Sequence, residues 1–216
     1  MKRFYKFVIP LVTIIGLCVP SLFALEDDEY YTAYNLWYEH PEKMWSINYK
    51  RGQVIPAGSK VQLVSGRGRG GGEFYRTLRN KRGHGNDKRS RDRGRRRPIR
   101  LEVIDSEMEI TIYFTPKFHP GLTKDEFVKR LLTKSTLEEL TAGMTHQEKS
   151  CIERAVVEVG ISKKATLIAL GYPPEHFTAS TDSSRWYFWT SRMVKKIIDF
   201  SDDKATVGLE SSPRIP

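Results

Sequence analysis

The sequence predicts an α+β fold: a small antiparallel β module over residues 30–116, followed by a helix pair packed on a three-stranded antiparallel sheet. Three observations predict it. Short runs in the first half alternate apolar and polar residues, the pattern of half-buried strands. Residues 121–171 repeat a Ser or Thr start signal ahead of apolar stripes at helical spacing. Aromatic and β-branched runs at 185–200 then indicate further strands.

Length and composition agree with a folded chain. At 216 residues, the protein is long enough for one large domain or two small ones. Since 39% of its residues are hydrophobic and 11% are aromatic, it can build a core, which excludes a chain that is disordered throughout.

Residues 1–24, MKRFYKFVIPLVTIIGLCVPSLFA, have the features of a secretory signal peptide: a basic start, an apolar stretch and small residues near the end. A retained membrane anchor is the alternative, although about 18 apolar residues containing two prolines would span a bilayer only marginally. Lipid attachment at Cys18 is disfavoured because Leu17 stands where a lipoprotein signal has a small residue. Cys151 is then the one cysteine after the leader, which excludes an intrachain disulfide. We expect an exported protein.

Two hairpins are expected in the β module. In the first, strands at Trp45–Tyr49 and Lys60–Val64 are joined through a turn at Pro56-Ala57-Gly58. In the second, IRLEVID and EITIYFTP flank a turn at Asp105-Ser106-Glu107. Alternation places two sets of residues in this second hairpin on one face each: Leu101, Val103 and Asp105 on the first strand, and Ile110, Ile112 and Phe114 on the second.

The segment 66–97 lies between two of these strands and holds the whole basic excess. It has 13 Lys and Arg and 3 Asp and Glu, against 36 and 26 in the whole chain, so the remainder is neutral. Because its glycines and like charges give it no core to bury, we expect a solvated insertion into the β module. The candidate anion-binding residues are Arg67, Arg69, Arg76, Arg79, Lys81, Arg82, Lys88, Arg89, Arg91, Arg93, Arg95, Arg96 and Arg97.

Helical signals fill the middle of the chain. Thr123, with Glu126 three residues later, predicts a capping box, and TLEEL predicts a further helical turn; together they form a helical connector over 121–140. Thr145 and Glu148 predict a second box. The helix that it starts is expected to end at Gly160, with an apolar face formed by Cys151, Ile152, Ala155, Val156 and Val159.

The next helix is predicted to start at Ser162 as N-cap and to end at Gly171 in a left-handed C-cap. A loop with Pro173 follows it. RWYFWTS and MVKKIIDF are then read as strands, ATVGLE as a third strand, and residues 211–216 as a tail.

The run VEVGISKKATLIALGYPPEHFTASTDSSRWYFW resembles the SmpA/OmlA domain of BamE-type envelope proteins. Gly160 and Ser162 stand for that family's Gly-Met-Thr/Ser helix start, with Ile161 in place of the usual Met. Gly171 and Pro173 stand for its Leu-Gly-x-Pro element, and Trp186 for its strand aromatic. The resemblance implies a BamE-like α+β domain over 141–209 and a scaffold or accessory role in outer-membrane assembly. The whole chain also resembles a family of uncharacterised bacterial exported proteins.

No catalytic residue, metal site or cofactor is expected. His146 and Cys151 are five residues apart, which places them about 140° apart around a helix. None of the histidines has zinc-ligand spacing, and four of them border loops that contain Pro or Gly, so we expect surface or turn histidines. GRGRGGG lacks the GxxxxGK[S/T] pattern of a phosphate loop. The aromatic run Trp186–Trp189 is interpreted as sheet core, with a ligand platform as the alternative.

These features favour a non-enzymatic cell-envelope protein in the periplasm or at the outer-membrane periphery, acting as a scaffold or accessory factor. The expected partners are another envelope protein and an anionic membrane or wall surface, which the basic segment would contact. The alternative is a nucleic-acid-binding protein that uses the same segment. It is disfavoured by export, and because only Phe74 and Tyr75 are there to stack on bases.

Overall fold

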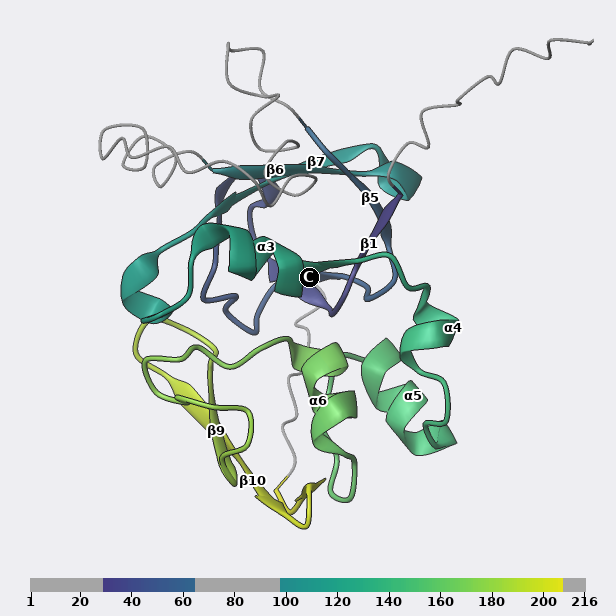
Figure 1. Cartoon of the computed structure of the whole chain (residues 1–216), viewed down its shortest axis with the longest axis vertical. Helices are drawn as coiled ribbons and strands as arrows, with labels where there is room; N and C mark the ends of the chain where they lie inside the picture. The colour runs from purple at the N-terminus through teal and green to yellow at the C-terminus, as the bar shows by residue number, and fades with distance from the viewer. Residues whose placement is uncertain (1–28, 65–97, 208–216) are drawn as a thin grey trace, which may run out of the picture.

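The computed structural model describes residues 29–64 and 98–207, and these residues form the mixed α+β fold that the sequence predicts (Figure 1). The β module lies at the top of Figure 1, and the C-terminal helices and strands lie below it. The strands are β1 (Tyr30–Thr32), β2 (Leu36–Tyr38), β3 (Met44–Trp45), β4 (Gln53–Ile55), β5 (Lys60–Leu63), β6 (Ile99–Val103), β7 (Met108–Tyr113), β8 (Leu132–Thr133), β9 (Arg185–Trp189), β10 (Lys195–Ser201) and β11 (Lys204–Ala205). The helices are α3 (Lys124–Leu131), α4 (Leu137–Leu140), α5 (His146–Glu153) and α6 (Lys163–Leu170).

A curled sheet in the order β3-β7-β6-β5-β1-β8 forms the body of the β module. The expected hairpin of β6 and β7 is confirmed, with Leu101 opposite Ile110. Its turn is a 3-10 helix over Ile104–Ser106 that ends at Glu107, which adopts a left-handed conformation (φ 52°). Asp105 lies in this turn, as expected, and is exposed; because β6 ends at Val103, Asp105 does not continue the strand face of Leu101 and Val103.

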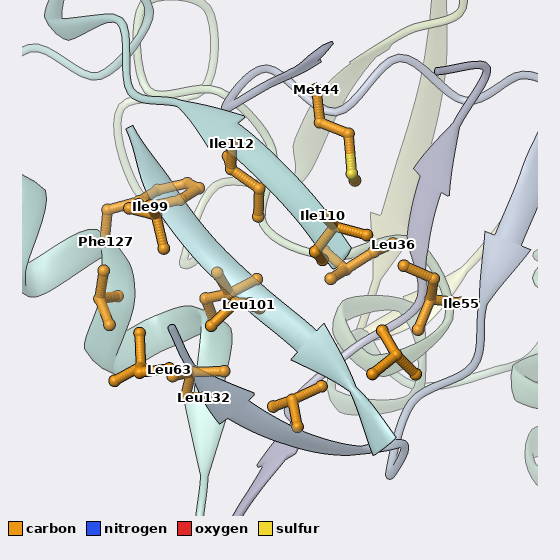
Figure 2. Close-up of a cluster of buried hydrophobic side chains, with 14 of the residues drawn as sticks. Leu36, Met44, Ile55, Leu63, Ile99, Leu101, Ile110, Ile112, Phe127 and Leu132 are labelled. Carbon is orange, nitrogen blue, oxygen red and sulfur yellow. The ribbon is translucent and has the colours of Figure 1, made fainter. Parts of the chain in front are cut away.

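The core of the β module lies between this sheet and α3 (Figure 2). Leu101 and Ile110 are fully buried in it, and α3 contributes Phe127 and Leu131. The capping box that starts α3 at Thr123 is confirmed. Strand β8, which follows α3 directly, pairs with β1. The part of the expected connector that forms α3 and β8 therefore belongs to the β module.

The strand expected at Trp45–Tyr49 is wrong. Only Met44–Trp45 pairs, as β3, and Asn48 has a φ of 48°, which turns the chain. The Asn48 Oδ1 accepts a hydrogen bond from the Trp37 backbone N–H at 3.0 Å, so this turn is fixed by a side chain rather than by a strand partner. The strand that forms instead is β4, which pairs with β2. The Pro56–Gly58 turn is present, but it joins β4 to β5, which lie in different sheets.

The C-terminal part has α5 and α6 packed on a three-stranded antiparallel sheet in the order β11-β10-β9. Trp186 and Phe188 of β9 and Ile198 of β10 point into the core, where α6 supplies Ile168 and Ala169. The third strand was expected within ATVGLE; it is β11, which overlaps that run only at Ala205.

Helix α5 ends at Glu153, seven residues before the expected end at Gly160. Ala155 takes a left-handed conformation (φ 53°), and the Val156 N–H reaches back to the Cys151 carbonyl at 3.0 Å. This is the Schellman arrangement, with alanine where glycine is usual. Val159 consequently lies outside the helix and is 60% exposed, so its expected place on the apolar face is wrong.

Asn35 joins the two parts of the chain. Its Nδ2 donates to the carbonyls of Ile152 on α5 (2.6 Å) and Ala169 on α6 (3.1 Å), and its Oδ1 accepts from the Ala57 N–H (2.7 Å). Its own backbone N–H donates to the Ile168 carbonyl at 3.0 Å. One buried carboxamide thus ties the loop before β5 to the C-terminal ends of both helices.

We predict that Asn35→Ala lowers the free energy of unfolding by about 2–4 kcal/mol, because a buried N–H and two buried carbonyls lose their partner. Urea denaturation of the two proteins measures the difference. The exposed amide of Gln62 on β5 provides the matched control, and Gln62→Ala should change stability by less than about 0.5 kcal/mol. Equal stabilities for Asn35→Ala and the control would contradict the joining role.

Candidate functional site

The 13 basic residues of the expected anion-binding segment lie outside the described residues. The strands that flank the segment are described, and they are neighbours: Leu63 of β5 is opposite Leu101 of β6, and the Val64 N–H donates to the Arg100 carbonyl at 3.0 Å. The described residues before and after the segment therefore belong to paired strands.

The five residues that carry the SmpA/OmlA resemblance all support the helix pair. Ser162 accepts from the Ala165 N–H as the α6 N-cap, and Gly160, with a φ of 92°, donates its N–H to the Ala205 carbonyl. Gly171 has a positive φ of 79° as expected, but its ψ of −177° is not the left-handed helical value. A Cβ at Gly171 would lie 2.6 Å from the Tyr34 ring. Pro173 follows in the loop, and Trp186 is fully buried.

The first chemistry-bearing cluster is buried between the two parts of the chain. The His119 Nδ1 lies 2.6 Å from Glu175 Oε2, and its Nε2 lies 3.1 Å from the Ser46 Oγ. Arg130 pairs with the other oxygen of Glu175. Burial acts to raise the pKa of Glu175, but the hydrogen bond from His119 and the neighbouring positive charges outweigh it and hold the pKa below its usual value. The ionised carboxylate accepts from Nδ1–H, and Nε2 lies within hydrogen-bond distance of the Ser46 hydroxyl.

This serine–histidine–carboxylate order is that of a hydrolase triad, but its surroundings favour a structural role. The Ser46 Oγ already accepts the Thr115 N–H at 3.1 Å, so the row of donors and acceptors is complete. Ser46 and His119 are both buried, and the hollow beside them has room for about one water molecule. The His119 ring is also stacked on Phe114. The hydrogen bonds of the cluster hold three loops together.

His119 lies in a turn, as expected for the histidines, but it is not a surface residue, because it is buried and hydrogen-bonded on both ring nitrogens. Ser46, His119 and Glu175 are separated by 56 residues or more in sequence. No local pattern joins them, so spacing could not have identified the cluster.

The second cluster lies on the outer face of the C-terminal sheet. Along β9, Trp186 and Phe188 point into the core, while Tyr187 and Trp189 alternate to the other face and are half-buried. The expected core position of this aromatic run therefore holds for only half of it. Phe177, from the loop before β9, completes the outer group.

A lysine ammonium sits among these rings. The Nζ of Lys195, at the start of β10, lies 3.7 Å from the ring centroid of Phe177, 5.2 Å from that of Trp189 and 5.9 Å from that of Tyr187. The His176 ring stacks on Trp189 at an interplanar angle of 5°. Three aromatic faces around one cation form an aromatic cage, which is a cation-binding arrangement.

Apolar side chains extend this surface to the end of the hairpin. Met193 is 89% exposed and Val194 is 53% exposed, and both lie in the connection between β9 and β10. Ile197, paired with Tyr187 across the hairpin, is exposed on the same side as the cage. An apolar patch of this kind is typical of a contact surface.

Lys50 is a third unusual group. It is buried, burial lowers its pKa from 10.5 to about 7, and its Nζ has no hydrogen-bond partner within the described ranges. Its nearest ring is Phe188, with the centroid 5.6 Å from Nζ. Its backbone N–H donates to the Trp189 carbonyl at 2.8 Å, so the backbone at this site ties the β module to β9.

Other candidate chemistry is not supported by the described part of the chain. Cys151 is fully buried, and burial raises the pKa of its thiol, as expected for a core residue. Across residues 29–64 and 98–207, no group of three His, Cys, Asp or Glu side chains is placed to hold a metal ion. The helices described there are all too short or too polar to cross a bilayer.

No family model, curated protein or solved structure matches the chain.

We predict that Lys50→Met stabilises the protein by about 3–5 kcal/mol below pH 7. Between pH 7 and 10.5 the unfolded chain holds a proton on Lys50 that the folded chain lacks, so stability rises with pH across this window. Below pH 7 both states are protonated, and the penalty of burying the charge is complete. The advantage of Lys50→Met should therefore shrink above pH 7 and vanish near pH 10.5.

Urea denaturation at pH 6, 8 and 10 measures this effect. Lys164→Met is the matched control, because Lys164 is an exposed lysine on α6, and it should show no such pH dependence. A Lys50→Met difference that is the same at all three pH values would contradict the buried-ammonium interpretation.

Proposed function

We propose that this protein is an exported, non-enzymatic component of the cell envelope, located in the periplasm or at the outer-membrane periphery. It acts there as a scaffold or accessory factor in outer-membrane assembly or maintenance. The observation that carries the proposal is the contrast between the two clusters. The polar groups suited to catalysis are buried and saturated, whereas the aromatic and apolar groups suited to contact are exposed on the C-terminal sheet.

Two further features support the proposal. Residues 1–24 have the order of a secretory signal. The helix pair on a three-stranded sheet is the arrangement that a BamE-like domain implies, and Ser162, Gly171 and Trp186 have structural roles in it. The partner of such a scaffold is another envelope protein.

The basic segment gives the scaffold a second contact. Each Lys or Arg near an anionic membrane surface contributes on the order of 1 kcal/mol, so 13 of them are sufficient to hold a protein on anionic lipid or wall polymer. Arginine suits phosphate because its guanidinium binds two oxygens at once. Nucleic acid is the rival ligand for the same residues.

Cell fractionation with sequencing of the mature N-terminus tests the proposal. We expect the protein in the envelope fraction with an N-terminus near Leu25. A cytoplasmic protein that still begins at Met1 would contradict the proposal and favour nucleic-acid binding. Labelling of Ser46 by a fluorophosphonate probe would contradict the non-enzymatic assignment, with Ser46→Ala as the control for site specificity.

Deletion of residues 66–97 separates the basic segment from the folded body. We expect the deletion variant to lose binding to phosphatidylglycerol vesicles while its melting temperature stays within a few degrees of the parent value. The reason is that β5 and β6 are already paired where the segment begins and ends. Unfolding of the variant, or undiminished vesicle binding, would contradict an inserted anion-binding segment.

A further inference from the structure

We propose that the aromatic cage formed by Phe177, Tyr187 and Trp189 binds the trimethylammonium headgroup of a zwitterionic phospholipid, displacing the Lys195 ammonium that fills it. The Met193–Val194 tip of the same hairpin enters the bilayer surface beside the headgroup. This inference rests on the proposed function, since it requires the protein to lie next to a membrane.

The geometry of the cage fits an ammonium ion. Cations are attracted to the negative face of an aromatic ring within about 6 Å of its centroid, and all three centroids meet that limit around one nitrogen. The cage is also held in place. His176 stacks on Trp189 and donates its Nδ1–H to the Phe118 carbonyl, while the Tyr187 N–H donates to Thr178 Oγ1 at 3.0 Å.

The present occupant shows which chemistry the cage accepts, and it can leave. Lys195 is exposed, and its Nζ reaches the rings through a long flexible side chain. A lysine ammonium is strongly hydrated, whereas a trimethylammonium group is not, so exchanging one for the other returns the better-solvated cation to water. The released Lys195 then lies beside the phosphate of the same headgroup.

 Arg192 directly precedes Met193 in the chain, so both cations, Arg192 and Lys195, flank the apolar pair at the tip.

The shape of the tip favours a bilayer over a protein partner. Met193 and Val194 project from a tight turn that is closed by the Thr190 N–H to the Val194 carbonyl at 3.0 Å. Two exposed apolar side chains between two cations are the pattern of an interfacial membrane contact, in which apolar groups enter the acyl boundary and cations meet phosphate. A convex tip of this kind offers a protein partner little area to bury.

A soluble probe tests the cage by itself. Tetramethylammonium chloride is titrated into the full-length protein while the indole N–H resonances of the tryptophans are followed by NMR. We expect the Trp189 resonance to shift, and Lys195→Ala to bind the probe at least about 5-fold more tightly because the internal competitor is gone. Trp189→Leu should weaken binding at least about 10-fold. Lys164→Ala, which removes an exposed lysine on α6, should bind like the parent.

The direction of the Lys195→Ala effect distinguishes a cage from a structural cluster. A lysine that merely stabilises the hairpin would leave probe affinity unchanged or lower when removed. Lys195→Ala binding no more tightly than the parent would therefore overturn the cage, provided that the variant keeps the parent's spectrum elsewhere.

Vesicles test the source of the ammonium group. Phosphatidylcholine vesicles have no net charge, so the basic segment gains little from them. We expect the full-length protein to bind them, and the double variant Met193→Ser, Val194→Ser to bind about 10-fold more weakly with unchanged affinity for tetramethylammonium. Probe binding without any difference between the parent and this double variant on vesicles would overturn the lipid assignment and favour a lysine of a protein partner.

The inference and the proposed function fail in different ways. An envelope protein whose Trp189 does not respond to the probe retains the proposed function and loses the cage. A protein found in the cytoplasm with an intact Met1 loses the proposed function, whatever its cage binds.

Discussion

The carboxamide of Asn35 is the interaction on which the arrangement of the chain depends. Carbonyls in the last turn of a helix have no partner within the helix, and Asn35 donates to one such carbonyl on α5 and to another on α6. Its oxygen accepts the Ala57 N–H, which lies just before β5. The same residue therefore satisfies both helix ends and fixes them against the β module. The ring of the neighbouring residue, Tyr34, packs against Gly171, where a Cβ would lie too close to that ring.

A second contact joins the same two parts of the chain. It involves polar side chains whose burial is unfavourable for folding. Glu175, from the loop after α6, pairs with His119 and Arg130 of the β module. Between the two contacts, the turn at 46–50 buries Asn48 Nδ2 and Lys50 Nζ without hydrogen-bond partners among the described residues. A buried ammonium without a partner is destabilising. The junction is thus held by Asn35 and Glu175 against an unfavourable contribution from Lys50.

The helix starts were predicted correctly from the sequence, whereas one helix end, one strand and the contacts between distant residues were not. The boxes at Thr123 and Thr145 start helices where expected, because a capping box is completed within four residues. The end of α5 was wrong because the turn at Ala155 uses a residue that rarely takes a left-handed conformation. The strand expected at Trp45–Tyr49 fails for a similar reason at Asn48. The Ser46–His119–Glu175 cluster and the cage could not be predicted at all, since each needs residues that only the tertiary fold brings together.

The Ser46–His119–Glu175 cluster and the aromatic cage also differ in the interactions that their surroundings leave open to a ligand. In the buried Ser46–His119–Glu175 cluster, the Ser46 hydroxyl and both ring nitrogens of His119 already have hydrogen-bond partners, so a substrate would have to displace one of them. In the aromatic cage, strand alternation brings Tyr187 and Trp189 to a face of the sheet that neither α5 nor α6 covers. Bare aromatic rings on such a face would promote association between molecules. Lys195 places a charge over them and keeps that surface hydrated, so the cage remains covered until a cation that is less well solvated takes its place.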